Sequence, residues 1–274
     1  MMKTTITMLL GAALAVPGFA AENLLGKAEV KAHPYPEKAA EMLDGNFETQ
    51  WMGYTAANSD GKITATFPEE TEFQTIAIHG GNLVSGTVEL SPDGITWEAP
   101  AAMTTANAPG MLGFILDKPR KIKALRLSLA GGPEKQAVVV RELYVFVPDV
   151  PENLATLRKI TESGGDRNWR FPAVCLVDGN TATGTKYYSN YSGSAFEVDL
   201  GREETVSSVE FRGGAPFARM TVSVSADGRS WTQKAEKSNA AKGVPLTFDP
   251  AGARHVKIDV KGNFTSAPSE LIIR

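Results

Sequence analysis

A short polar motif that occurs twice in the chain offers the kinds of oxygen atoms that bind a hard cation. Calcium takes about six to eight oxygen ligands from carboxylates, carbonyls and hydroxyls. In each copy of the motif an aspartate supplies a carboxylate, an asparagine a carbonyl, and a threonine a hydroxyl together with its carbonyl. The alternative is an ordinary Asp-Gly-Asn turn that is satisfied by its own side chains. The copies are Asp44-Gly45-Asn46 with Thr49, and Asp178-Gly179-Asn180 with Thr183.

The other chemistry-bearing residues do not form a catalytic pattern. The histidines are His33, His79 and His255, and none lies in a metal-ligand or triad spacing. The chain has no Gly-x-Ser-x-Gly, no Gly-x-Gly-x-x-Gly and no phosphate loop. The one cysteine, Cys175, stands in an apolar segment, which predicts a buried thiol and excludes an internal disulfide. We expect a protein that is not an enzyme, although by count alone the carboxylates would suffice for a two-carboxylate glycosidase.

The first residues of the chain are typical of a signal peptide. Lys3 is followed by an apolar run from Ile6 to Val16, a Pro-Gly helix breaker and small residues up to Ala20. The run is too short for a permanent membrane anchor. We expect residues 1–20 to be cleaved off, with cleavage after Ala21 as the alternative, and the protein to be exported to the periplasm or the cell exterior. A buried N-terminal helix is the other reading of this segment.

Charge and hydropathy exclude two classes of partner. The chain has 28 Lys+Arg and 31 Asp+Glu, a net charge of −3, and its basic residues are scattered. Nucleic acid demands a concentrated basic face, and no such face or polybasic run occurs. After the signal peptide no stretch reaches transmembrane length, so we expect neither a nucleic-acid partner nor membrane insertion.

Four sequence blocks recur in the same order at a nearly constant offset, which indicates an internal duplication. Each copy spans roughly 120 residues, a normal size for one domain. The proline-bearing acidic stretch between the copies is typical of a linker. We therefore predict a first domain over 22–148, a linker over 149–152 and a second domain over 153–274. The blocks pair Asp44–Asn46 with Asp178–Asn180, Ile76–Gly81 with Val209–Gly214, Ser91–Trp97 with Ser225–Trp231, and Arg141–Leu143 with Ser269–Leu271.

Within each copy the apolar pattern is that of β-strands. Asp93-Gly94 and Asp227-Gly228 each lie between two such segments, which is a strong hairpin signal. Trp97 and Trp231 follow those turns, and we expect both in the core. Helical periodicity is weak, with a short turn over 38–43 as the best candidate. Strands are predicted at 63–67, 87–90, 123–129, 195–200, 220–224 and 255–260. The pattern predicts an all-β fold of two tandem antiparallel β-sandwich domains.

Three motifs stand in the same order in both copies: Asp-Gly-Asn-x-x-Thr early, Ser-x-Asp-Gly-x-x-Trp midway, and a glutamate before the last strand. Together they resemble the discoidin, or coagulation-factor type C, superfamily, which includes bacterial family 32 carbohydrate-binding modules. Asp199-Leu200-Gly201 matches the sheet-end motif of that family in the second copy, where the first copy has Thr66-Phe67-Pro68. The lack of a disulfide between the domain termini places the chain with the bacterial branch.

The resemblance implies a galactose-binding-like jelly roll in each domain, with one structural calcium ion on its side and ligand-binding loops at one end. In such folds the glutamate before the last strand closes the calcium shell and ties it to the early loop. The two copies, each with its glutamate, favour calcium over a plain turn. The predicted calcium ligands are Asp44, Asn46, Thr49 and Glu142 in the first domain, and Asp178, Asn180, Thr183 and Glu270 in the second.

A sugar site needs an aromatic face for the apolar side of the ring and polar donors for its hydroxyls. By resemblance, Phe264 lies where family 32 modules often carry a stacking aromatic, with Asn263 beside it. Arg212 lies where related modules place a polar sugar contact. Arg167 and Trp169 precede the calcium motif, on what should be the same end of the domain. A core position is the alternative for Phe264 and for Trp169.

The first copy offers a poorer ligand site. His79 takes the position of Arg212, the late loop 131–135 has no aromatic residue, and Trp51 is expected in the core. The aromatic cluster at 187–191 is either a second binding patch or part of a domain interface. We expect the main sugar site in the second domain, and the first domain to be a spacer or to bind something else.

The predicted function is weak, calcium-stabilised recognition of galactose-type glycans or glycoconjugates by an exported protein. The alternative is a protein-interaction or surface-assembly module without sugar binding, because discoidin folds also bind proteins. A phospholipid binder ranks third, because no loop combines exposed apolar residues with basic neighbours.

Overall fold

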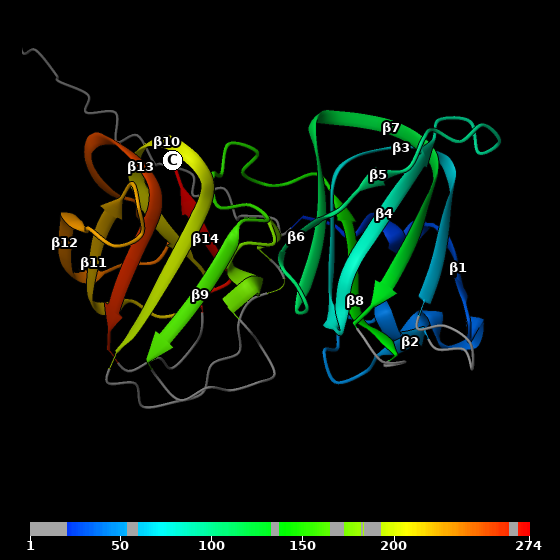
Figure 1. The fold of residues 1–274 in the computed structure, drawn as a ribbon, viewed down its shortest axis with the longest axis horizontal. Helices are drawn as coiled ribbons and strands as arrows, with labels where there is room; N and C mark the ends of the chain where they lie inside the picture. Colours follow the sequence, from blue (N-terminus) through cyan, green and yellow to red (C-terminus); the bar gives the residue numbers. More distant parts are fainter. Residues whose placement is uncertain are drawn as a thin grey trace, which may run out of the picture.

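The chain forms two antiparallel β-sheets that lie side by side (Figure 1). The computed structural model describes residues 21–53, 60–132, 137–164, 173–181, 183, 193–262 and 268–274. The predicted signal peptide lies outside the described residues. Within them the regular structure consists of strands and short 3-10 helices, and the all-β prediction is confirmed. None of the helices in these residues is long and apolar enough to cross a membrane.

The first sheet comes from the predicted first domain and runs in the order β2-β8-β3-β7-β4-β5, with β1 against β3 and β6 against β7. Strand β3 pairs with β1 in its first part and with β8 in its second, and register shifts between Thr66 and Thr71 mark the change. Such irregularities bend a strand, so one long strand serves both faces of the domain. The elements are η1 (Leu24–Lys27), β1 (Glu29–His33), η2 (Pro36–Met42), β2 (Trp51–Gly53), β3 (Asp60–Gly81), β4 (Leu83–Ser91), β5 (Ala101–Ala102), β6 (Thr104–Asn107), β7 (Met111–Gly131) and β8 (Val138–Phe146).

The second sheet comes from the predicted second domain and runs in the order β12-β11-β13-β10-β14, with β9 against β10. Strand β10 repeats the behaviour of β3: its first part pairs with β9 and its last part with β14, with a register shift between Asp199 and Glu204. The elements are β9 (Lys159–Gly164), η3 (Ala173–Leu176), β10 (Ser194–Arg212), β11 (Phe217–Ser225), β12 (Thr232–Ala240), β13 (Leu246–Lys261) and β14 (Glu270–Ile273).

Alternating burial along the strands explains why these sequences form sheets. In β10, Phe196, Val198 and Leu200 are at most 4% exposed, while the residues between them face outward. The predicted core position of Trp51 is confirmed, since its ring is fully buried and its Nε1 donates a 2.8 Å hydrogen bond to the Pro34 carbonyl. The expected strands all form, and the short turn expected over 38–43 is the end of η2.

The tryptophans of the two Asp-Gly motifs correct the prediction that they fill the core. Trp97 and Trp231 are half-buried and lie on the outer face of their sheets. The Arg126 guanidinium lies 4.1 Å from the Trp97 ring centroid, and His255 packs edge-on against Trp231. Arg126 and His255 belong to outward-facing positions of β7 and β13, so each tryptophan covers a basic side chain of its own sheet.

The strand register shows how closely the two copies correspond. His79 of β3 pairs with Glu142 of β8, and Arg212 of β10 pairs with Glu270 of β14. An identical tripeptide, Glu-Asn-Leu, begins each copy at residues 22–24 and 152–154, a repeat that the sequence analysis missed. The Asn23 side chain hydrogen-bonds backbone groups of Leu143 and Val145, and Asn153 does the same to Leu271 and Ile273. In both copies, therefore, one asparagine fastens the entry of the domain to its last strand.

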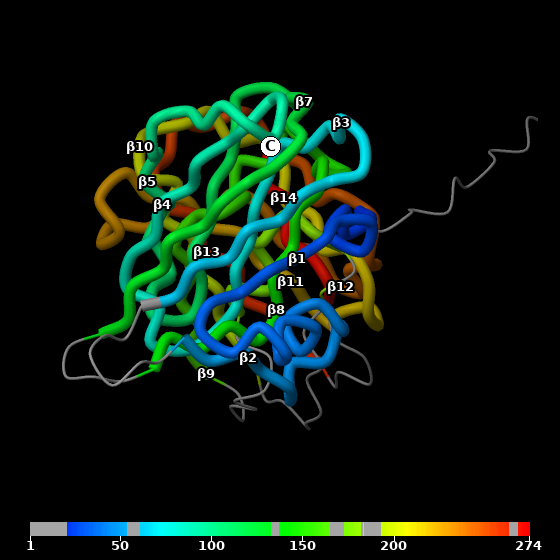
Figure 2. The backbone as a smooth tube through the Cα atoms, turned by 90° about the vertical axis from the view of Figure 1, so that its right-hand side faces the viewer, coloured from blue at the N-terminus to red at the C-terminus, as the bar shows by residue number. Residues whose placement is uncertain are grey.

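The two sheets share buried surface. One hydrophobic cluster contains the core of the second domain together with Ala77, Met111, Tyr144 and Phe146 of the first. Viewed from the side, the strands of the first sheet lie in front of those of the second (Figure 2). The Asn107 side chain donates to the Arg158 carbonyl at 2.7 Å and accepts from the Ile160 amide at 3.0 Å, which links the end of β6 to β9. The domains therefore pack as one body.

This packing predicts that the full chain unfolds in a single transition. It also predicts that Asn107 stabilises the folded chain. Asn107→Ala removes both hydrogen bonds to β9, and we expect it to lower the free energy of unfolding by about 1–3 kcal/mol. Urea unfolding followed by tryptophan fluorescence measures this. Gln233→Ala, at an exposed position of β12, is the control and should change little. Two separate transitions in the wild type, or no effect of Asn107→Ala, would contradict the shared packing.

Candidate functional site

Several strand ends of the second domain meet at one edge, where the predicted ligand loops begin. Ser194, at the start of β10, pairs with Gly164 at the end of β9 and with Val260 near the end of β13. Met220 of β11 also pairs with Val260. These ends lie at the lower edge of the second domain in Figure 1. Strand β2 lies at the lower edge of the first domain in the same view. The described residues that flank the predicted ligand loops, Gly164, Ser194 and Val260, therefore lie together at one end of the domain.

Of the ligand residues predicted in the second domain, the structure describes only Arg212. Arg167, Trp169, Asn263 and Phe264 lie outside the described residues. Arg212 ends β10, and its side chain is 32% exposed. Its Nε donates to a Glu210 carboxylate oxygen at 3.2 Å, and its charge also acts on Glu270. The guanidinium is therefore held in place by acidic neighbours while one third of the side chain stays open to solvent.

A second basic side chain of this domain, that of Lys242, packs on two aromatic rings and was not predicted from the sequence. The Lys242 ammonium nitrogen lies 3.3 Å from the ring centroid of Phe217 and 5.0 Å from that of Phe211. Among the described residues it has no hydrogen-bond partner, and burial lowers the pKa of Lys242 to about 7. Because the two rings come from β10 and β11, sequence spacing gives no sign of this contact.

In the first domain the predicted calcium motif forms a compact group of oxygens. The Thr49 hydroxyl lies 2.6 Å from the Asn46 carbonyl and 2.9 and 3.0 Å from the two carboxylate oxygens of Asp44. The Asn46 amide donates to Asp44 at 2.8 Å, as in a self-satisfied Asp-Gly-Asn turn. Gly45 has φ +72°, which favours glycine at this position. The local hydrogen bonds are thus those of a self-satisfied Asp-Gly-Asn turn. The same turn brings together the oxygen atoms that were predicted to bind calcium.

Glu142 is the residue that the turn alone does not explain. Its side chain is fully buried, and no donor of the described residues makes a hydrogen bond of good geometry to either carboxylate oxygen, although the Asn46 amide and the Tyr144 hydroxyl lie near enough to favour its charged form. Burial, together with the nearby Asp44 carboxylate, raises the pKa of Glu142 to about 8. A buried carboxylate beside another acid is costly unless a proton or a cation neutralises it. The oxygen-rich surroundings of Glu142 therefore fit calcium.

The second domain repeats this arrangement with deeper burial. Asp178, Asn180, Thr183 and Glu270 are all less than 9% exposed. The Asn180 amide donates to Asp178 at 2.9 Å, and the Thr183 hydroxyl donates to the Asn180 carbonyl at 2.8 Å. Asn153 donates to one oxygen of Glu270 at 3.1 Å, while its other oxygen has no partner in the described part of the chain. Burial and the Asp178 carboxylate raise the pKa of Glu270 well above its usual value.

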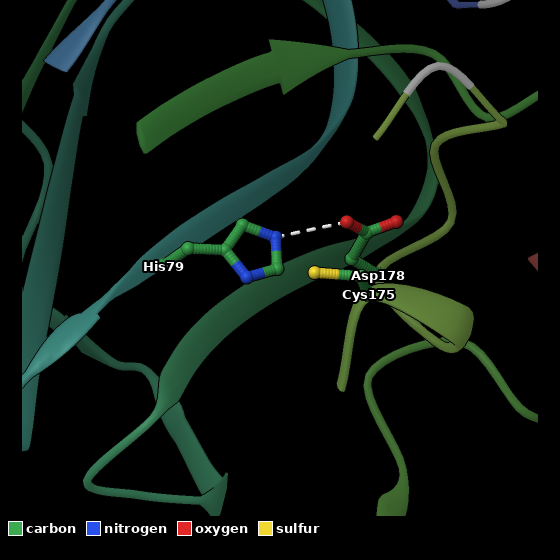
Figure 3. A group of neighbouring side chains, drawn as sticks. All are labelled: His79, Cys175 and Asp178. Carbon is green, nitrogen blue, oxygen red and sulfur yellow. Dashed lines mark hydrogen bonds and ion pairs between the residues drawn. The ribbon is translucent and has the colours of Figure 1, made fainter. Parts of the chain in front are cut away.

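His79 corrects the prediction that it contacts a ligand. Its side chain is 2% exposed, so a sugar at the surface cannot reach it. Instead the His79 Nε2 lies 2.8 Å from a carboxylate oxygen of Asp178, across the boundary between the two domains (Figure 3). The rings of Phe47 and Tyr144 pack edge-on against the imidazole at 5.4 and 6.0 Å. Tertiary packing thus joins His79 of the first repeat to the Asp-Gly-Asn turn of the second.

Cys175 lies in the same buried group, and the predicted buried thiol is confirmed. Its sulfur, a ring nitrogen of His79 and a carboxylate oxygen of Asp178 all lie within 4.8 Å of one another. Burial, with Asp178 and Glu270 nearby, raises the pKa of the Cys175 thiol well above its usual value. A buried thiol of this kind is a poor nucleophile, because the thiolate is the reactive form.

Comparison with known proteins identifies a family for the second repeat. Residues 159–272 match the F5/8 type C domain, so the resemblance to the discoidin superfamily is confirmed there. No curated protein matches the chain.

Among solved structures, similarity is spread over several proteins. A chitosan-binding module 1 from a chitosanase/glucanase of Paenibacillus sp. IK-5 is 22% identical, covering 45% of this chain and 98% of the module, with a TM-score of 0.40. The CBM32-1 and CBM32-2 domains of Clostridium perfringens ZmpB in complex with GalNAc are 13% identical, covering 93% and 91%, with a TM-score of 0.37. A fucolectin from striped bass (Morone saxatilis) serum is 15% identical, covering 93% and 98%, with a TM-score of 0.35.

The buried ammonium group of Lys242, a partly buried residue, predicts a rise of stability with pH. Its folded-state pKa of about 7 lies below the ordinary 10.5. Between these values the unfolded chain binds a proton that the folded chain does not, so the free energy of unfolding increases with pH, by at most about 1.4 kcal/mol per pH unit. Lys242→Met should remove this rise, as urea unfolding between pH 7 and 10 would show. The exposed Lys237→Met is the control. A rise that persists in Lys242→Met would contradict the assignment.

Proposed function

We propose that the chain, whose second repeat matches the F5/8 type C domain, is a non-catalytic protein that binds carbohydrate mainly through its second domain. The family match over 159–272 carries this proposal, because the discoidin superfamily includes carbohydrate-binding modules. The geometry supports it: the ends of β9 and β13 meet the start of β10 at one edge of the domain, and the Arg212 guanidinium at the end of β10 is restrained by Glu210.

The proposed site combines Arg212 with the aromatic ring of Phe264, and Asn263, Arg167 and Trp169 flank it. The ring would cover the apolar face of a galactose-type sugar, and the exposed third of Arg212 would donate hydrogen bonds to its hydroxyls. Because Glu210 and Glu270 act on the guanidinium, little side-chain entropy is lost when it engages a sugar. The partners of this protein would be glycans or glycoconjugates.

We also propose one structural calcium ion in each domain. Asp44, Asn46, Thr49 and Glu142 would hold the first, and Asp178, Asn180, Thr183 and Glu270 the second. The burial of Glu142 beside Asp44 and of Glu270 beside Asp178 supports an ion at each place, because each pair brings two acidic groups together away from water. Calcium would supply the positive charge that neutralises these carboxylates, and the early loop would thereby be tied to the last strand.

The order of charge, apolar run and small residues over 1–20 supports a further part of the proposal, that the protein is exported and acts in the periplasm or at the cell exterior.

Sugar binding is best tested on the full chain, because the core of the second domain includes residues of the first. We expect galactose or N-acetylgalactosamine to bind with roughly millimolar to high micromolar affinity in calorimetry or NMR titration. Arg212→Ala and Phe264→Ala should each weaken binding several-fold, since each contact is worth on the order of 1 kcal/mol.

Arg254→Ala is the control, because Arg254 is a more exposed arginine that, like Arg212, pairs with an acidic side chain of its own sheet, in this case Asp199. Binding that survives both site variants would place the sugar elsewhere. A glycan array without any bound sugar would remove the carbohydrate proposal and favour the protein-interaction alternative.

Calcium binding predicts a melting temperature that depends on the metal. EDTA should lower it and added calcium should restore it, because a ligand of the native state stabilises that state. Glu142→Gln should weaken the calcium response of the first site. Asp93→Ala is the control, since Asp93 also accepts hydrogen bonds from its own turn but lies on an exposed loop without a buried glutamate behind it. Identical melting curves with EDTA and with calcium would refute the metal proposal.

A further inference from the structure

A pocket opens at the surface where the two domains meet, and it uses none of the residues of the proposed sugar site. Its volume is about 260 Å³, slightly below the usual range for drug-sized ligands, so it suits a small chemical group. Its walls come from three parts of the chain: β6 and β7 of the first domain, the segment that leads into the second domain, and the middle of β10. The lining residues are Thr104, Ile115, residues 151–154 and 156–158, Arg202 and Glu204.

Arg158 brings an unpaired positive charge to this pocket. Its backbone is fixed on two sides, because its amide donates to the Ala155 carbonyl at 3.0 Å and its carbonyl accepts from the Asn107 side chain at 2.7 Å. Its guanidinium lies against Gly201 of β10, where an added Cβ would be 3.3 Å from the Arg158 Nη1. Within the described part of the chain no hydrogen bond or ion pair reaches this partly buried guanidinium, so its donors are available to a ligand.

The other charged groups that line the pocket are each paired. The Arg202 Nε lies 2.5 Å from a carboxylate oxygen of Glu204, and the Arg274 Nε lies 3.2 Å from one of Glu152. Each acid thus has an arginine of its own, and Arg158 remains as the excess positive charge. A guanidinium binds a carboxylate through two parallel, charge-assisted hydrogen bonds. The charge balance of the pocket therefore favours a ligand group with a carboxylate.

Apolar side chains form much of the remaining wall. Ile115 on β7 is 43% exposed, and Leu154 and Pro151 are also open to solvent in part. None of the lining residues is aromatic, so the pocket lacks the flat face on which a sugar ring packs. An aliphatic group that covers Ile115 and Leu154 would remove their apolar surface from water, which is favourable in proportion to the area covered.

We propose that this pocket binds an apolar group that ends in a carboxylate, with the carboxylate on Arg158 and the apolar body against Ile115 and Leu154. A free small acid and the C-terminal residue of a peptide share this chemistry. Because both domains contribute walls, the ligand would contact both of them. The inference does not depend on carbohydrate binding or on calcium, since the proposed sugar and calcium sites use other residues.

The full chain provides the test, with isocaproate as the probe, because this acid combines the side chain of leucine with one carboxylate. In NMR titrations we expect shifts of the amide signals of Ile115 and of residues 152–158, with a dissociation constant of roughly millimolar size. The uncharged isocaproamide should bind about tenfold more weakly, and added salt should weaken binding of the acid. Equal binding of acid and amide, or no shifts at these residues up to about 20 mM acid, would overturn the proposal.

A second titration identifies the source of the carboxylate. The tripeptide Gly-Gly-Leu is compared with the same peptide carrying an amidated C-terminus. Shifts of the same amide signals with the free peptide alone would support a peptide end as a ligand. Binding of isocaproate without binding of either peptide would support a free small acid.

Variants then locate the site. Arg158→Ala should weaken isocaproate binding about tenfold, and Ile115→Glu should do the same by adding a negative charge to the apolar wall. Arg229→Ala is the control, because Arg229 is an exposed arginine between β11 and β12 whose side chain has no ion-pair partner within the described ranges. Isocaproate binding that is unchanged in both pocket variants would show that the assignment is wrong. Galactose titration of the same variants should give the wild-type result, which separates this outcome from failure of the proposed carbohydrate function.

Discussion

Buried acid at the boundary between the two domains is the constraint to which much of the structure responds. Glu142, Asp178 and Glu270 are at most 2% exposed, and removing carboxylates from water is costly unless charge or hydrogen bonds compensate. The described compensation is partial. His79 reaches Asp178 and Asn153 reaches Glu270, while no hydrogen bond of good geometry from the described residues reaches the oxygens of Glu142 or the second oxygen of Glu270. Either a bound proton or the calcium proposed above would neutralise these carboxylates.

The two repeats share the same strand pairing at this place, but they differ in the residues that occupy it. In each repeat a nitrogen-bearing side chain on one strand lies opposite a glutamate on the last strand. The pairs are His79 with Glu142 and Arg212 with Glu270. In the second domain Arg212 is one-third exposed at the end of β10. In the first domain, His79 is buried at the boundary and contacts Asp178 of the second domain. The same position of the repeat is therefore buried against the other domain in one copy and partly open to solvent in the other.

The packing of the domains also bears on how a ligand would be bound. Because Phe146 and Tyr144 of β8 belong to the core of the second domain, the two loop ends are held in one body and not on a free hinge. Both ends lie on the same side of the molecule in Figure 1. A long or branched glycan could therefore contact both domains at once, which raises the effective concentration of a second, weaker contact.

The sequence by itself determined the architecture and the local motifs. Period-two burial in segments such as 195–200, the paired Asp-Gly-Asn turns and the repeated block order are properties of neighbouring residues, so they can be recognised without coordinates. The tertiary structure decided what those motifs meet. Trp97 and Trp231 share the spacing of core residues, yet they cover basic side chains on outer faces. His79 and Asp178 are 99 residues apart, and no periodicity connects them. Their contact arises because apolar surface on each domain is buried against the other, which brings every polar group along that boundary into proximity.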